Sequence, residues 1–153
     1  MKRVSVMGVV VGAVADIVAS NVAAFPILVV AATKVDVRSL PKQEQGHALL
    51  QAVQATHSLF AAQLLLGSAC SVLGGYIAAR IAKHDQVLNG ALSAFLCVGL
   101  GVYALLAKSD GFSPLTHAAL FVASPLCGAL GGYLAERGSR STAGPPVAPA
   151  TAA

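Results

Sequence analysis

The sequence has too few charged residues to cover a water-soluble domain. Only 10% of its 153 residues are charged, whereas 56% are hydrophobic. A soluble domain carries about 25% charged residues, so most of the surface of this protein does not face water. The composition excludes an ordinary soluble enzyme or binding module and indicates an integral membrane protein.

Other classes of protein are excluded by further absences. Basic residues occur in scattered pairs without interleaved aromatics, and Trp is absent, so we do not expect a nucleic acid partner. The cysteines Cys70, Cys97 and Cys127 form no C-x-x-C pair and are odd in number, which argues against a disulfide framework. The chain also lacks H-E-x-x-H, G-x-S-x-G, a phosphate-binding loop and a dinucleotide fingerprint. We therefore predict neither an enzyme nor a bound cofactor.

Long apolar segments are what the chain does contain. We predict four membrane-spanning helices, at about residues 4–32, 58–81, 87–107 and 115–135. Each is long enough to cross a hydrocarbon core of about 30 Å at about 1.5 Å per residue. The first segment contains a signal-like Ala13-Val-Ala15, but it stays apolar far beyond that point, so we expect it to be retained. The predicted fold is all-α: residues 1–137 form a four-transmembrane-helix bundle made of two hairpins.

Two polar regions lie outside these spans. In residues 33–56, Leu49, Leu50 and Val53 recur at helical spacing after Pro41, which predicts a short amphipathic helix in the outer loop, on the membrane surface or leading into the second span. Residues 138–153 contain mainly Ser, Thr, Ala, Gly and Pro without periodicity, and are predicted to be a disordered cytoplasmic tail.

Lysine and arginine residues predict the orientation, because they are enriched on the cytoplasmic side of membrane proteins. With the N-terminus inside, the inner residues are Lys2, Arg3, Arg80, Lys83, Arg137 and Arg140, and the outer ones are Lys34, Arg38, Lys42 and Lys108. The bias predicts a multi-pass protein with both termini cytoplasmic and the lipid bilayer as its surroundings.

One pattern occurs twice with a constant offset. Cys70-Ser-Val-Leu-Gly-Gly-Tyr-Ile-Ala-Ala-Arg80 ends the second predicted span, and Cys127-Gly-Ala-Leu-Gly-Gly-Tyr-Leu-Ala-Glu-Arg137 ends the fourth. The repeat predicts two hairpins of one kind lying side by side. Because small residues let helices approach closely in lipid, we expect helix packing at Gly67, Ser71, Gly74, Gly75, Cys127, Gly131 and Gly132.

The aromatic and basic residues of the repeat allow two interpretations. Tyr76 and Tyr133 are of the kind that prefers the membrane interface, and Arg80 and Arg137 follow one turn later as anchors. Alternatively, both copies together form a ligand site, for a lipid headgroup near the two arginines.

Asp16 is the candidate functional residue. It lies near the middle of the first span, where an ionised carboxylate costs at least about 2.5 kcal/mol, so it faces protein or water or is protonated. Ser20 shares its helix face and Asn21 shares it partly. Residues at similar depth on other spans are Ser68, Ser71, Ser93 and Ser124. Two interpretations remain open: a proton- or cation-coupling site, or a hydrogen-bonded aspartate that holds the helices together.

His57 and His117 are weaker candidates. Each follows a threonine at the outer end of a span that carries the repeat. Two such rings brought together would suit a metal or a pH response, and the alternative is a pair of polar interfacial residues. Gln63, within the second span, suits a packing hydrogen bond as well as a pore lining.

Four features carry a resemblance to known proteins: Asp16, the stretch 71–82, Asn89-Gly-Ala-Leu92 at the start of the third span, and the stretch 131–137 at the end of the fourth. In these features the chain resembles an uncharacterised group of small four-span proteins of the bacterial inner membrane. The resemblance implies a bacterial plasma-membrane location and no particular activity. Small four-span multidrug exporters also have an acidic residue in their first span, but this chain lacks their Trp.

Two functional hypotheses follow from the sequence. The first is a non-enzymatic protein that associates with itself or with another membrane protein through its small-residue faces. The second is a small transporter or channel with Asp16 as its proton- or cation-coupling residue.

Overall fold

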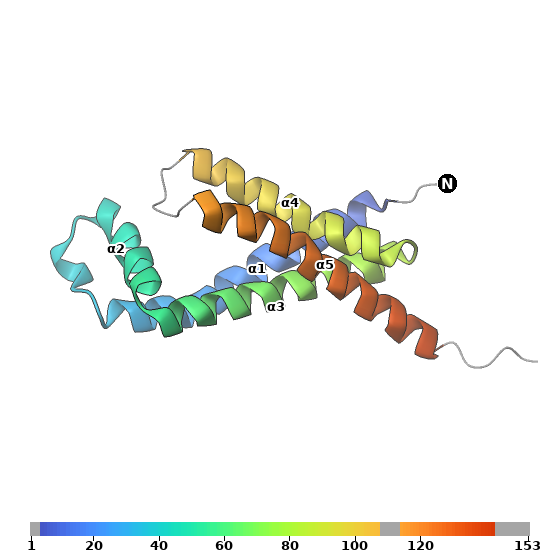
Figure 1. Cartoon of the computed structure of the whole chain (residues 1–153), viewed down its shortest axis with the longest axis horizontal. Coiled ribbons are helices and arrows are strands. Elements are labelled where there is room, and N and C mark those ends of the chain that lie inside the picture. Colours follow the sequence, from blue (N-terminus) through green and yellow to red (C-terminus); the bar gives the residue numbers. More distant parts are fainter. Residues whose placement is uncertain (1–3, 108–113, 143–153) are drawn as a thin grey trace, which may run out of the picture.

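The computed structural model describes residues 4–107 and 114–142, with side chains for all of these except 101–107, 114–120, 140 and 142. Over these residues the chain is helical and contains no strand, which confirms the all-α prediction (Figure 1). The α-helices and one 3-10 turn are α1 (Val6–Ala32), η1 (Val37–Ser39), α2 (Lys42–Ala55), α3 (His57–Ala82), α4 (Gln86–Ala107) and α5 (Pro114–Thr142).

The long helices form an elongated bundle in which α3 is central. It packs along α1 and also contacts α4 and α5, while α4 packs against both α1 and α5. The short helix α2 lies at one end of the bundle, and the start of α1 and the end of α5 lie at the other (Figure 1). The chain therefore enters and leaves the bundle at the same end.

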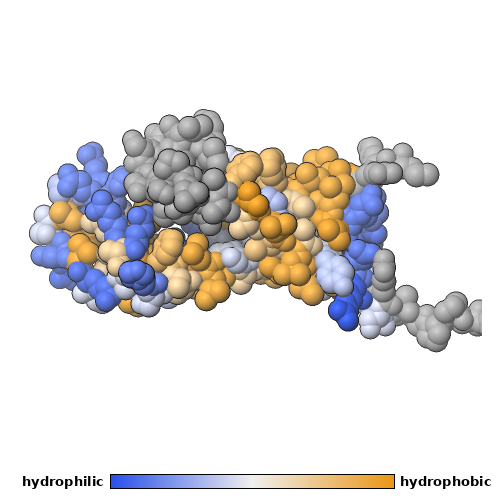
Figure 2. Space-filling model, in the orientation of Figure 1, coloured by the Kyte–Doolittle hydropathy of each residue, from blue (hydrophilic) through white to orange (hydrophobic). Residues whose placement is uncertain are grey.

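The distribution of side chains is the reverse of that in a water-soluble protein. The buried hydrophobic residues are mostly alanines, whereas many large ones are exposed, such as Leu65 (73%) and Val122 (62%). Hydrophobic residues gather between two hydrophilic ends of the bundle (Figure 2). In the described part of the chain, α1 and α3 are long and apolar enough to cross a membrane, and Gln86–Leu100 of α4 is a shorter apolar stretch.

Glycines allow α1 and α3 to touch through their backbones. A Cβ atom on Gly12 would lie 2.6 Å from the Gly74 carbonyl oxygen, and one on Gly74 would lie 2.7 Å from the Asp16 Cβ. A Cβ atom on Gly8 would lie 2.8 Å from the Ala78 carbonyl oxygen. Since real Cβ atoms do not approach so closely, each of these positions requires glycine at the observed helix separation.

The contact between α3 and α5 is equally close. A Cβ on Gly75 would overlap the backbone of Gly128, and a Cβ on Gly131 would lie 2.7 Å from the Tyr76 nitrogen. On the other side of α5, a Cβ on Gly132 would lie 2.8 Å from the Cα of Val87 in α4. These glycines therefore join α5 to both α3 and α4.

The two Gly-Gly pairs differ in their surroundings despite the repeat in the sequence. In α3 the first glycine, Gly74, faces α1 and the second, Gly75, faces α5. In α5 the first glycine, Gly131, faces α3 and the second, Gly132, faces α4. Gly67 was predicted to pack, but a Cβ there would have no atom within 4 Å. The small-residue pattern identifies the contact regions without identifying which helix each residue meets.

Of the two segments outside the predicted spans, the amphipathic helix is present as α2, which leads into α3 after the single residue Thr56, and the tail differs from expectation. The apolar face of α2 packs onto the ends of α1 and α3, with Val53 1% exposed beside Ile27 and Ala31, so this helix is part of the fold. Helix α5 continues to Thr142 and includes the first residues of the predicted tail. That prediction was based on composition, and Gly138 does not interrupt the helix, since no glycine in the described residues has a positive φ. The rest of the predicted tail, 143–153, lies outside the described residues.

Candidate functional site

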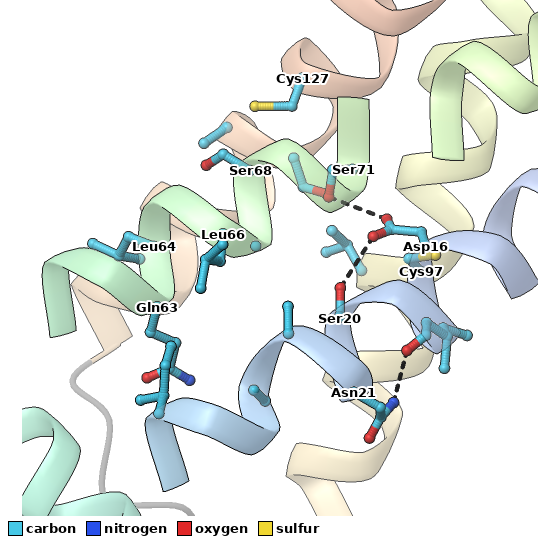
Figure 3. A pocket seen from close by; sticks show the side chains of 18 of the residues that line it. Asp16, Ser20, Asn21, Gln63, Leu64, Leu66, Ser68, Ser71, Cys97 and Cys127 are labelled. Atoms are coloured by element: carbon cyan, nitrogen blue, oxygen red, sulfur yellow. Dashed lines mark hydrogen bonds between the residues drawn. The ribbon is translucent and has the colours of Figure 1, made fainter. Parts of the chain in front are cut away.

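Asp16 is buried at the contact between α1 and α3 and is 5% exposed. Its Oδ1 accepts a hydrogen bond of 3.2 Å from the Ser20 hydroxyl, and its Oδ2 accepts one of 3.1 Å from the Ser71 hydroxyl (Figure 3). Both carboxylate oxygens are thus bound by hydroxyl donors, one from the same helix and one from α3.

Gly74 explains why Ser71 reaches the carboxylate. The backbone of Gly74 lies against the Asp16 side chain, where any Cβ would collide. Ser71 is three residues earlier on α3, and positions three apart lie on the same helix face. The close approach at Gly74 therefore brings the Ser71 hydroxyl to Asp16, and Ser20 reaches it from one turn further along α1.

A cavity of about 440 Å³ extends from Asp16 between α1, α3, α4 and α5. Its polar lining residues are Asp16, Ser20, Asn21, Gln63, Ser68, Ser71 and Ser124 (Figure 3). Its larger apolar lining residues are Ile17, Ile27, Phe60, Leu64, Leu66 and Val98. Among the described residues of this lining, Asp16 is the only one with a charged side chain, so no cation there offsets its charge.

The two remaining residues of the predicted site have different roles. Asn21 lines the cavity, but its side-chain amide donates to the Ile17 carbonyl of its own helix at 2.7 Å. Ser93 does not belong to the site: it is 1% exposed and its hydroxyl donates to the Gly90 carbonyl at 2.9 Å. Gly67 and Cys127, predicted as packing residues, are part of the cavity wall.

The hydrogen bonds of two polar residues, Cys97 and Asn89, were not predicted from the sequence. Cys97 of α4 lies beside Asp16, and its thiol donates to the Ala13 carbonyl at 3.3 Å (Figure 3). Asn89 is fully buried; its Oδ1 accepts from the Ser5 backbone at 2.8 Å, and its amide donates to the carbonyls of His84 and Asp85. An asparagine within an apolar helix was the available signal for the second of these.

The arginines of the repeat lie at the end of the bundle where α1 begins and α5 ends. The Arg80 guanidinium lies 5.7 Å from the centre of the Tyr76 ring and donates to the Ser139 hydroxyl at 3.5 Å. Tyr133 and Arg137 are exposed. The cation–π contact holds Arg80 over its own helix.

The two predicted histidines are not brought together by any described contact. His57 is exposed at the start of α3, while His117 belongs to the beginning of α5, where side chains are outside the described residues. Among the described side chains there is no group of three or more His, Cys, Asp or Glu residues that would hold a metal ion.

Scans of the chain against protein-family models, curated proteins and solved structures gave no match. Function is therefore inferred from the cavity and its buried carboxylate.

Proposed function

We propose that the chain is a four-span protein of the bacterial inner membrane and that it acts as a small transporter or channel with Asp16 as its proton- or cation-coupling residue. The four-span arrangement is supported by helix length. The shortest long helix, α4, has 22 residues, which corresponds to about 33 Å and matches a hydrocarbon core of about 30 Å. The large exposed hydrophobic side chains would then face lipid.

The topology is supported by the ends of the helices. The start of α1 and the end of α5 lie at one end of the bundle, together with Arg80 and Arg137. Positively charged residues favour the cytoplasmic side, so we infer that both termini are cytoplasmic and that α2 lies on the outer side.

Asp16 carries the functional proposal. A buried carboxylate without a cationic partner is costly in lipid, and such residues mark ion or substrate pathways. Two serine hydroxyls stabilise the carboxylate without neutralising its charge. A proton or a bound cation would neutralise it, and the adjoining cavity gives such a ligand room.

The competing hypothesis of a purely packing protein is less well supported. The small-residue faces on which it depends, including those at Gly12, Gly75 and Gly131, are occupied by contacts between helices of the same chain. They are therefore not available for self-association or for a partner without opening the bundle.

The test is cation-coupled proton flux through purified protein in lipid vesicles. A pH-sensitive dye inside the vesicles would report proton movement when gradients of Na⁺, K⁺ or tetraethylammonium are imposed. We expect wild-type protein to give flux above empty vesicles, Asp16→Asn to abolish it, and Asp36→Asn, which removes an exposed carboxylate, to leave it unchanged. Absence of flux for every gradient with the wild-type protein would refute the proposal.

A further inference from the structure

We propose that the ligand of this cavity is an organic monocation with an apolar body, held by its charge at Asp16 and by its body along the apolar wall. The inference rests on the proposed function and specifies its substrate class. It depends on the cavity lining, which is polar around Asp16 and mainly apolar further along α1 and α3, toward Ile27 and Phe60.

The charged group of the ligand belongs at the end of the cavity formed by Asp16, Ser20 and Ser71. Beyond this end, α1 and α3 close on each other through the contacts of Gly12 with Gly74 and Ala78. A cation in the cavity therefore meets the carboxylate at a closed end, where it neutralises a charge that has no cationic partner among the described residues of the lining.

The body of the ligand belongs in the opposite half of the cavity. Helices α1 and α3 run antiparallel, so the lining continues along α1 to Ile27 and along α3 back to Leu64 and Phe60. Asp16 and Ile27 are separated by about 16 Å at helical rise. A ligand that fills the cavity therefore places most of its surface against aliphatic and aromatic side chains, with the Gln63 amide as the polar group among them.

An inorganic cation fits the lining less well. Hard metal ions such as Ca²⁺ and Mg²⁺ require about six or more oxygen ligands. The closed end offers the two oxygens of Asp16 and the hydroxyl oxygens of Ser20 and Ser71, and both hydroxyl protons are already directed at the carboxylate. An organic cation needs no such shell, because one carboxylate and apolar contacts satisfy it. The volume of about 440 Å³ also falls within the range of small-molecule sites, about 300–1,000 Å³.

The probe is the series from tetramethyl- to tetrabutylammonium, with binding measured calorimetrically on full-length protein in lipid nanodiscs and with empty nanodiscs as the blank. We expect affinity to rise by about fourfold for each methylene that reaches the wall, until the ion exceeds the cavity. We expect Asp16→Asn to weaken binding by at least about tenfold and Asp36→Asn to leave it unchanged.

A matched pair of glycine variants tests the location independently of the carboxylate. Gly67 lies in the cavity wall and Gly99 lies outside the lining, and a Cβ at either would have no atom within 4 Å. A side chain at either position therefore begins in open space, without a collision at its first atom. Gly67→Leu should lose tetrapropyl- and tetrabutylammonium binding by at least about tenfold, because its side chain occupies the space of the ligand. Gly99→Leu should bind all members as the wild type does.

Two results would overturn the inference. One is equal binding of the series by wild type, Asp16→Asn and Gly67→Leu. The other is absence of binding across the series while Na⁺ or K⁺ gradients still drive Asp16-dependent proton flux, which would leave the proposed function intact and exclude the organic cation. Absence of both binding and flux would refute both proposals together.

Discussion

Replacing Gly131 by alanine tests the close approach of α3 and α5. A Cβ at this position would lie 2.7 Å from the Tyr76 nitrogen and closer still to the Val72 carbonyl oxygen. An ordinary contact begins at 3.4 Å, so α5 must move by about 0.7 Å or more relative to α3. Both obstructing atoms are backbone, which no side-chain rotation can clear.

The cost can be estimated from opposing effects. Overpacking a well-packed contact costs about 1–3 kcal/mol, and the upper end applies because backbone atoms are involved. Alanine is more favourable than glycine in a helix by about 1 kcal/mol. We therefore expect Gly131→Ala to lower the free energy of unfolding by about 2 kcal/mol.

Gly138→Ala is the matched control, because Gly138 lies on the same helix and a Cβ there would have no atom within 4 Å. This variant should gain up to about 1 kcal/mol from helix propensity alone. The assay is reversible unfolding in mixed micelles titrated with dodecyl sulfate and followed by far-UV circular dichroism. If both variants shift the midpoint equally, the inferred backbone contact between α3 and α5 is refuted.

Three other predictions concern stability and topology. Asn89→Leu should lower the free energy of unfolding by about 2–4 kcal/mol, since it removes a buried side chain that bridges three backbone groups. The control Asn21→Leu, at an exposed site, should lower it by less than about 1 kcal/mol in the same titration. Equal losses for the two variants would contradict the bridging role of Asn89. Val53→Ala should weaken docking of α2 by about 1–2 kcal/mol, seen as faster hydrogen exchange in α2 with α3 unchanged; uniform exchange across both helices would argue against local docking. In a background without the native cysteines, Ser39→Cys and Ser141→Cys should be labelled from opposite sides of an oriented membrane by an impermeant maleimide, and labelling from the same side would exclude the proposed topology.

Helix positions were predictable because hydrophobicity and length are local properties. The predicted segments 4–32 and 58–81 correspond closely to α1 and α3. The start of the tail was misplaced because it was predicted from its Ser, Thr, Ala, Gly and Pro composition, which does not show how far the preceding helix continues. Asp16 was identifiable because a carboxylate within a long apolar segment stands out regardless of the fold.

The partners of Asp16 required the tertiary structure. Ser68, Ser71, Ser93 and Ser124 all lay at similar predicted depth, but depth does not give rotation about the helix axis. The contact at Gly74 rotates α3 so that Ser71 reaches the carboxylate, while Ser93 is turned toward its own helix backbone.

The amino-acid sequence alone determined that the chain forms long apolar helices with one carboxylate deep in the first, since composition and periodicity act within each segment. Only the packing of the helices decided that Gly67 lines a cavity, whereas Gly74 and Gly131 lie where two helices touch through their backbones. The physical reason is that each glycine permits contact in any direction, and the direction used depends on how all the neighbouring helices fit together.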